Sequence, residues 1–105
     1  TGWSGGSASG EGKRMAIKLT RAMVTAALNG DLEKSEFYKD ETFNVLVPKS
    51  CPNVPDDVLT PRNTWKDKAA YDKAANELAG LFEKNFAKYK DMPQQIIDAG
   101  PKAKK

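Results

Sequence analysis

The chain has 105 residues, of which 39% are hydrophobic, and this length is enough for one domain. Its 17 Lys and Arg residues exceed its 14 Asp and Glu residues by three, an excess that Lys102, Lys104 and Lys105 supply entirely. We therefore expect a solvated basic tail and exclude a nucleic-acid-binding surface, which needs clustered basic residues with stacking aromatic ones.

Residues 1–20 open with a glycine-dense loop, which leads into two cations, Lys13 and Arg14. Glycine tolerates positive φ and lets the backbone approach a ligand closely, which favours an anion or a nucleotide. The spacing matches no standard phosphate motif: a Walker A sequence would need Gly in place of Ser7 and Ser or Thr in place of Arg14, and Gly-x-Gly-x-x-Gly would need Gly in place of Met15. Spacing alone leaves a flexible surface loop and a nucleotide contact as equal alternatives.

A strand and a helix are predicted after this loop. Met15, Ile17 and Leu19 alternate with less apolar neighbours, a pattern typical of a short half-buried strand. Thr20 is predicted to be the N-cap of a helix over residues 21–29, which the Asn-Gly step at its end would stop.

The middle of the chain is predicted to contain little regular structure. Residues 31–42 are mixed and charged, which suggests a connector with one helical turn. Apolar residues alternate at 43–47, which predicts a short strand ended by a proline. Because prolines are concentrated here, residues 43–66 are interpreted as a wrapping segment, with Val58 and Leu59 anchored against a core.

The strongest helical pattern lies at residues 67–90, with Asp67 as the predicted N-cap. Apolar residues recur there at three- and four-residue steps and form one continuous stripe. The stripe consists of Tyr71, Ala74, Ala75, Leu78, Leu81, Phe82, Phe86 and Tyr89. Such a stripe predicts packing and a docking helix that needs a partner surface. A short helix is predicted at 93–100, because proline suits a first helical turn and a Gly-Pro step ends it.

Chemistry-bearing residues are scarce. The chain has no histidine, the commonest general base, and its single Cys51 can form neither an internal disulfide nor a Cys-rich zinc site; we expect a packed free thiol. The adjacent Asp56 and Asp57 point apart on a turn. We therefore predict no catalytic residue and no metal ligand within the chain.

No apolar run approaches the roughly 20 residues that cross a bilayer, and no signal peptide is visible, so we expect a cytoplasmic location.

Several short stretches occur in a distinctive order. They are Thr1-Gly2-Trp3, Gly12-Lys13-Arg14-Met15, Lys18-Leu19-Thr20-Arg21-Ala22, Val47-Pro48-Lys49-Ser50-Cys51-Pro52-Asn53-Val54-Pro55, Pro61-Arg62-Asn63-Thr64-Trp65, Asp67-Lys68-Ala69-Ala70-Tyr71-Asp72, Leu81-Phe82 with Asn85-Phe86, and Ala99-Gly100-Pro101. In this order they resemble the C-terminal region of the ATP-dependent phosphoenolpyruvate carboxykinases. The resemblance covers nearly the whole chain.

The resemblance implies that a mostly helical α+β segment with short strands forms the C-terminal part of a larger α/β nucleotide-binding domain. It implies that Arg14, Met15 and Thr20 contact ATP. Arg14 would lie over the base and ribose, Met15 would line the pocket and offer backbone groups, and the Thr20 hydroxyl would donate to adenine. Lys13 would act near the phosphates.

The family's reaction converts oxaloacetate and ATP into phosphoenolpyruvate, ADP and CO2 in gluconeogenesis. The resemblance implies that the phosphate-binding loop, the ligands of a divalent metal (Mn or Mg) and the oxaloacetate-binding residues precede Thr1. On this interpretation the 105 residues are inactive alone, and their partners are the remainder of the enzyme, ATP and oxaloacetate.

A second interpretation belongs to a different class. The chain would be a non-catalytic helical interaction module whose stripe at 71–89 binds a partner protein, with the glycine-rich loop as a linker. The two hypotheses differ at Arg14 and Thr20, which lie beside a nucleotide in the first and in solvent in the second.

Overall fold

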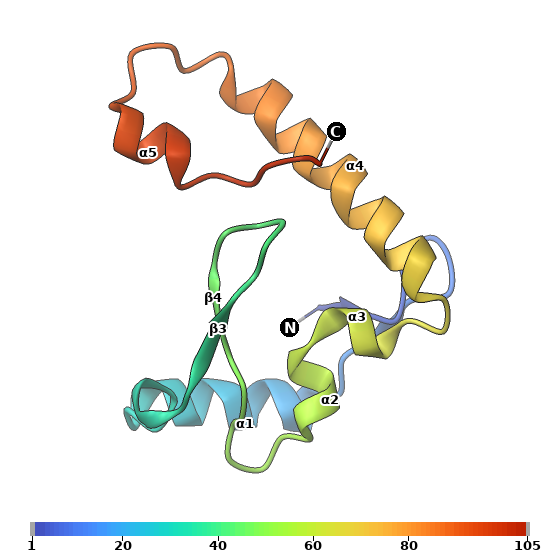
Figure 1. Ribbon diagram of the computed structural model, residues 1–105. Coiled ribbons are helices and arrows are strands. Elements are labelled where there is room, and N and C mark those ends of the chain that lie inside the picture. Colours follow the sequence, from blue (N-terminus) through green and yellow to red (C-terminus); the bar gives the residue numbers. More distant parts are fainter. Residues whose placement is uncertain (1, 105) are drawn as a thin grey trace.

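The computed structural model describes residues 2–104 and forms a small, flattened α+β structure of 41 × 32 × 19 Å. Within these residues, two separate two-stranded antiparallel sheets accompany five α-helices and one 3-10 turn. Figure 1 shows α4 crossing one side of the molecule, α1 lying below, and the β3–β4 hairpin rising between α1 and the C-terminal segment. The predicted mixture of helices and short strands is confirmed.

The first sheet is a hairpin of β1 (Trp3–Ser4) and β2 (Lys13–Arg14). The predicted strand over Met15, Ile17 and Leu19 is wrong, because Ile17 already begins a helix. The pattern misled because a spacing of four residues, as between Met15 and Leu19, fits one face of a helix as well as a strand.

Helix α1 (Ile17–Leu28) follows directly and begins without a side-chain cap. Thr20 is therefore not an N-cap, and that prediction is wrong: the Thr20 backbone N–H donates to the Ala16 carbonyl at 3.3 Å, inside the first turn. The predicted end is confirmed. Gly30 has φ of 78° and donates to the Ala27 carbonyl, while Asp31 N–H donates to the Ala26 carbonyl at 2.9 Å, which is the Schellman pattern.

A small core lies on the inner face of α1. Ala26, Cys51 and Val54 are buried there, and partly buried apolar residues surround them. The surrounding residues are Leu19, Ala22, Met23, Leu32, Val58 and Leu59. On α1, Leu19, Ala22, Met23 and Ala26 recur at helical spacing, which explains why the helix extends back past Thr20. The predicted anchoring of Val58 and Leu59 and the packed thiol of Cys51 are confirmed.

The second sheet is an antiparallel hairpin of β3 (Phe37–Lys39) and β4 (Leu46–Pro48), which the 3-10 turn η1 (Leu32–Lys34) precedes. The strand predicted from residue 43 begins only at residue 46, and β3 was not predicted at all. Both differences arise because a turn follows β3 and delays the start of β4. The Asp40 carboxylate stabilises this turn by accepting hydrogen bonds from the backbone N–H groups of Thr42 and Phe43 at 3.0 and 2.7 Å.

Two short helices, α2 (Asp56–Leu59) and α3 (Pro61–Thr64), occupy the segment predicted to have little regular structure. Each begins at or immediately after a proline. Pro61 is the first residue of α3, a position that proline prefers because its missing N–H costs nothing there, whereas Pro55 is the N-cap of α2.

Helix α4 (Lys68–Phe86) begins as predicted. The Asp67 carboxylate accepts hydrogen bonds from the backbone N–H groups of Ala69 and Ala70 at 2.9 and 3.2 Å. Packing of the whole stripe is not observed among the described residues: only small Ala75 and Ala79 are buried on this helix. Large members of the stripe are exposed, namely Leu78, Leu81, Phe82 and Tyr89.

The chain ends with α5 (Gln94–Asp98), directly after Pro93, and with a segment that returns along α4 (Figure 1). The basic tail is not simply solvated. Lys102 N–H donates to the Thr42 carbonyl at 2.9 Å, and Asn76 donates to the Lys104 carbonyl at 3.1 Å. The Lys104 side chain remains exposed, and Lys105 lies outside the described residues.

Candidate functional site

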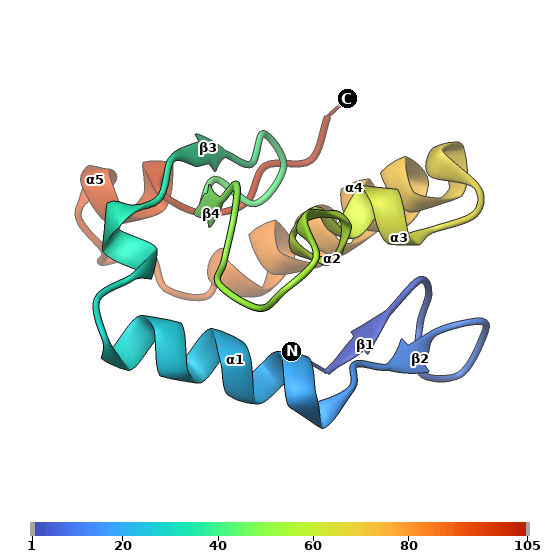
Figure 2. The same ribbon diagram turned by 90° about the horizontal axis from the view of Figure 1, so that it is seen from below.

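The β1–β2 hairpin carries Arg14, one of the three residues expected to bind a nucleotide, and its neighbour Lys13. Figure 2 shows the hairpin continuing from the N-terminal end of α1. In its register Trp3 faces Arg14 and Ser4 faces Lys13. Because successive residues of a strand point to opposite faces, Arg14 and Lys13 lie on opposite sides of the hairpin.

On one face, the guanidinium carbon of Arg14 lies 5.6 Å from the centre of the Trp3 ring, which is cation–π geometry. Arg14 is exposed, and within residues 2–104 it takes part in no ion pair. Its planar group therefore has no carboxylate partner among these residues, and its N–H edges are available to a ligand.

On the other face, Lys13 contributes to a shallow cavity of about 450 Å³. The lining residues are Ser4, Gly5, Glu11, Lys13, Thr64 and Lys66. Two ammonium groups against one carboxylate give this small cavity a net positive charge, which suits an anion.

The loop between the strands is folded on itself and tied to α3. Gly5, with φ of 79°, donates its N–H to the Thr64 hydroxyl at 3.0 Å. The Ser7 carbonyl accepts hydrogen bonds from Gly10 and Gly12 at 3.1 and 3.0 Å. A side chain at Gly12 would collide with the carbonyl of Ser7, 2.5 Å from an added Cβ. Glycine is therefore required at this position by close packing of backbone, and the loop is not an unstructured linker.

Met15 and Thr20 lie between the hairpin and the body of α1. The Met15 N–H donates to the Gly2 carbonyl at 2.6 Å, which prolongs the pairing of β1 and β2 by one residue. Thr20 is half-buried in the first turn of α1, where no side chain caps the helix. Its hydroxyl is therefore not committed to capping. The structure thus places Arg14, Met15 and Thr20 on one continuous stretch that leaves β2 and enters α1.

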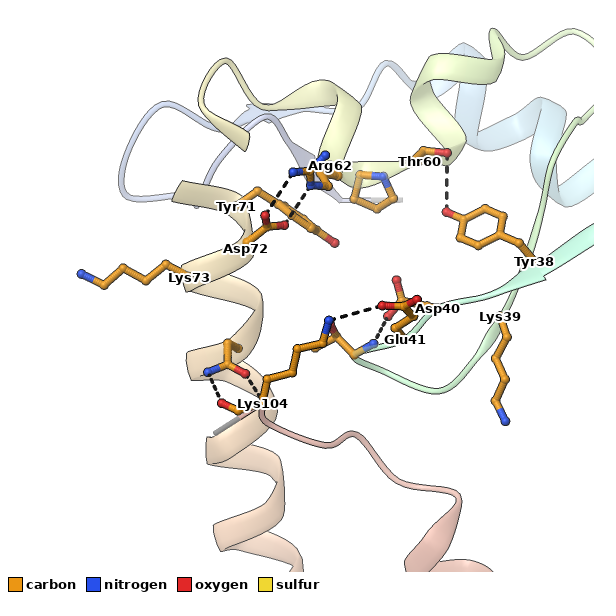
Figure 3. A pocket seen from close by; sticks show the side chains of 13 residues that line it. Tyr38, Lys39, Asp40, Glu41, Thr60, Arg62, Tyr71, Asp72, Lys73 and Lys104 are labelled. Carbon is orange, nitrogen blue, oxygen red and sulfur yellow. Dashed lines mark hydrogen bonds and ion pairs between the residues drawn. The ribbon is translucent and has the colours of Figure 1, made fainter. Parts of the chain in front are cut away.

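A second, larger cavity of about 760 Å³ was not anticipated from the sequence (Figure 3). It lies among the β3–β4 hairpin, α3, α4 and the C-terminal segment. Arg62 donates two hydrogen bonds to Asp72, at 2.9 and 3.1 Å, and the hydrogen bonding from Arg62 lowers the pKa of the Asp72 carboxyl. Lys104 pairs with Glu41 at 3.3 Å.

Two ion pairs, Arg62–Asp72 and Lys104–Glu41, neutralise four of the charged groups in this cavity. Figure 3 shows Lys39 and Lys73 pointing away from it, so they add no cation to its interior. Burial raises the pKa of the Tyr71 hydroxyl, which keeps that group neutral. The remaining Asp40 carboxylate accepts hydrogen bonds from the backbone N–H groups of Thr42 and Phe43, so it serves the β3–β4 turn, and we assign the cavity no chemistry.

The other reactive groups show no catalytic arrangement. Burial, and after it the charge of Asp31, raises the pKa of the Cys51 thiol, so the thiol stays protonated and unreactive at neutral pH. In the part of the chain that the structure describes, no group of three or more Cys, Asp or Glu residues converges in a way that would hold a metal ion. Nor is any described helix both long and apolar enough to cross a membrane.

Comparison with known proteins identifies the family. The family described as phosphoenolpyruvate carboxykinase matches residues 1–57. A phosphoenolpyruvate carboxykinase (ATP) of Caldanaerobacter subterraneus is 57% identical over 102 residues, and one of Moorella thermoacetica is 56% identical over 101 residues. A third, from Brevibacillus brevis, is 57% identical over 104 residues.

These alignments cover 96–99% of the present chain but only 19–20% of each relative, so the chain spans about a fifth of the length of the curated relatives. The chain belongs to the phosphoenolpyruvate carboxykinase family. The resemblance seen in the sequence is thereby confirmed, and no relative favours the interaction-module hypothesis.

Proposed function

We propose that this chain is part of an ATP-dependent phosphoenolpyruvate carboxykinase, which converts oxaloacetate and ATP into phosphoenolpyruvate, ADP and CO2 in gluconeogenesis. The observation that carries this proposal is the identity of 56–57%, over almost the whole chain, to relatives named phosphoenolpyruvate carboxykinase (ATP). On this proposal the 105 residues are the C-terminal segment of a larger nucleotide-binding α/β domain in a cytoplasmic enzyme.

Within that enzyme, this segment binds the adenine and ribose of ATP through Arg14, Met15 and Thr20. Three features support the assignment. The guanidinium of Arg14 is exposed and without an ion-pair partner among the described residues. Met15 follows it directly, and the Thr20 hydroxyl does not cap α1. A planar guanidinium stacks on a base, and a hydroxyl can donate to a ring nitrogen.

Lys13 takes a different part in this proposal. It lies on the opposite face of the hairpin from Arg14, within the positively charged 450 Å³ cavity. A nucleotide whose base rests on Arg14 would have to pass around the edge of the hairpin to reach Lys13. We therefore assign Lys13 a long-range electrostatic role toward the phosphates and no direct contact.

The chemical steps belong to residues outside this chain. The phosphates of ATP and a divalent metal, Mn or Mg, would be bound there together with oxaloacetate, and the metal would supply charge neutralisation for phosphoryl transfer. The present residues contribute by holding and orienting the nucleoside. This division of labour predicts that the 105 residues alone produce no phosphoenolpyruvate.

The proposal is tested by Arg14→Ala in the complete carboxykinase that carries this segment. Losing hydrogen bonds from a charged group costs about 1.5–3 kcal/mol, so the KM for ATP should rise about ten- to a hundredfold. Steady-state kinetics should show little change in the KM for oxaloacetate. Lys73→Ala removes an exposed positive charge on α4 and serves as the control. An unchanged KM for ATP with a raised KM for oxaloacetate would contradict the assignment.

A further inference from the structure

The two tryptophans of this chain have different surroundings. Trp65 is half-buried and packs edge-on against Tyr71, with ring centres 5.6 Å apart and an interplanar angle of 76°. Trp3 has 49% of its surface exposed, and the group that lies over its ring is the guanidinium of Arg14. Among residues 2–104, Trp3 therefore adds little to a core, and its ring contact is with the guanidinium assigned to the nucleotide.

We propose that Trp3 is a positioning residue: its indole supports one face of the Arg14 guanidinium and leaves the opposite face for the adenine ring of ATP. This inference rests on the proposed function and adds a residue to it. The cation would then be stacked between an aromatic ring of the protein and an aromatic ring of the ligand.

The backbone fixes this arrangement. Trp3 and Arg14 are directly opposite in the antiparallel register, so their side chains leave the hairpin on the same face and close together. The adjoining hydrogen bond from Met15 N–H to the Gly2 carbonyl, at 2.6 Å, holds the two strands at this position. The contact therefore follows from strand register and does not depend on a flexible loop.

The kind of group that lies beside Arg14 decides whether its guanidinium can bind a ligand. A carboxylate beside Arg14 would occupy its N–H donors and cancel its charge, as Asp72 does for Arg62 at 2.9 and 3.1 Å. An aromatic ring restrains the plane of the guanidinium and leaves its donors and its charge available. Restraining this flexible side chain before binding lowers the entropy cost of ordering it when the nucleotide arrives.

The test uses the complete carboxykinase with the variants Trp3→Leu, Trp3→Phe, Arg14→Ala and the double variant Trp3→Leu/Arg14→Ala. Steady-state kinetics give kcat and the KM for ATP and for oxaloacetate, and thermal unfolding gives Tm. Trp65→Leu is the matched control, because it removes the tryptophan that packs within the fold.

We expect Trp3→Leu to raise the KM for ATP about two- to fivefold, the range of an exposed cation–π contact. Trp3→Phe should recover part of this loss, because a phenyl ring still offers a face to the cation. The KM for oxaloacetate and kcat should stay near their original values. In the Arg14→Ala background, Trp3→Leu should have no further effect on the KM for ATP. Trp65→Leu should lower Tm without a selective change in the KM for ATP.

The possible failures can be told apart. If Arg14→Ala raises the KM for ATP and Trp3→Leu does not, the positioning role is wrong and the nucleotide assignment stands. If Trp3→Leu acts equally with and without Arg14, Trp3 acts on its own, and the positioning role is again wrong. If Arg14→Ala leaves the KM for ATP unchanged, the proposed role of Arg14 in nucleotide binding and this inference both fail. A Trp3→Leu variant that loses kcat and Tm together, without rescue by Trp3→Phe, would show a purely structural role.

Discussion

The half of the molecule around α1 and the half formed by α4 and α5 differ in how far their apolar side chains are covered. Around α1, the buried residues Ala26, Cys51 and Val54 are enclosed by partly buried neighbours from α1, η1 and α2. On α4, the buried residues are alanines, while Leu81 is 63% exposed and Phe82 is 48% exposed. Helical periodicity therefore predicts where an apolar face lies but does not reveal what covers it.

The exposed apolar face of α4 continues into a groove of about 590 Å³. This groove lies between the end of α4, helix α5 and the segment that follows α5. Aromatic and aliphatic side chains form much of its wall, among them Phe82, Phe86, Tyr89, Ile96 and Ile97. Exposed apolar surface of this kind usually marks a contact with another part of a protein. It agrees with the proposal that this chain works as part of a longer carboxykinase.

The largest expected effect follows from this contrast. The isolated 105-residue chain should aggregate or lack a sharp cooperative thermal transition, because the α4–α5 face has nothing to cover it. Phe82→Lys, within this face, should reduce aggregation measured by light scattering. Leu28→Lys, at an exposed residue on α1 outside the face, is the control and should help less. A monomeric isolated chain with a sharp unfolding transition would contradict the contrast.

A smaller effect is expected at the start of α4. Asp67→Ala removes the carboxylate that caps Ala69 and Ala70, which should cost about 0.5–2 kcal/mol. In the complete enzyme, hydrogen exchange of the first-turn amides of α4 should become faster by the corresponding factor. Asp56→Ala is a suitable control, because Asp56 lies in the first turn of α2, where no side chain caps the helix. Equal effects of the two substitutions would show that the cap contributes nothing special.

The smallest effect concerns the exposed Arg62–Asp72 pair. The hydrogen bonding from Arg62 lowers the pKa of Asp72 in the folded protein. The stabilising contribution is therefore present above the ordinary pKa of an aspartate and is lost as the pH falls through the lowered value. An NMR titration should give a lower midpoint for the Asp72 carboxyl in the folded protein than in urea, and Arg62→Gln should abolish the difference. Equal midpoints in the folded and unfolded states would show that the pair is not formed in solution.

Local signals allowed part of the fold to be predicted. Asp67 before a long periodic helix and the Asn-Gly step after α1 act within one or two turns of the chain, and both predictions are confirmed. The hairpin strands were missed or misplaced for the opposite reason. Strands β1 and β2 have two residues each, and only their pairing across the intervening loop defines them.

In the candidate site, too, some features could be predicted from the sequence and others depend on strand pairing. Arg14, Met15 and Thr20 were identified by resemblance, because the spacing around the glycines fits no phosphate motif. Their contact with ATP stays a prediction. The approach of Trp3 to Arg14 could not be foreseen, since it depends on the register of the hairpin. Thr20 was wrongly expected to cap α1, because the inner stripe of that helix starts before it.

The central claim is that the stretch from β2 into α1 contacts the adenine of ATP. The most direct measurement is photolabelling of the complete carboxykinase with an ATP analogue that carries an azido group on adenine, followed by mass spectrometry of the labelled peptides. The account predicts labelling within residues 13–20, suppressed by excess ATP and not by oxaloacetate. Labelling that avoids these residues, or that ATP does not suppress, would contradict it.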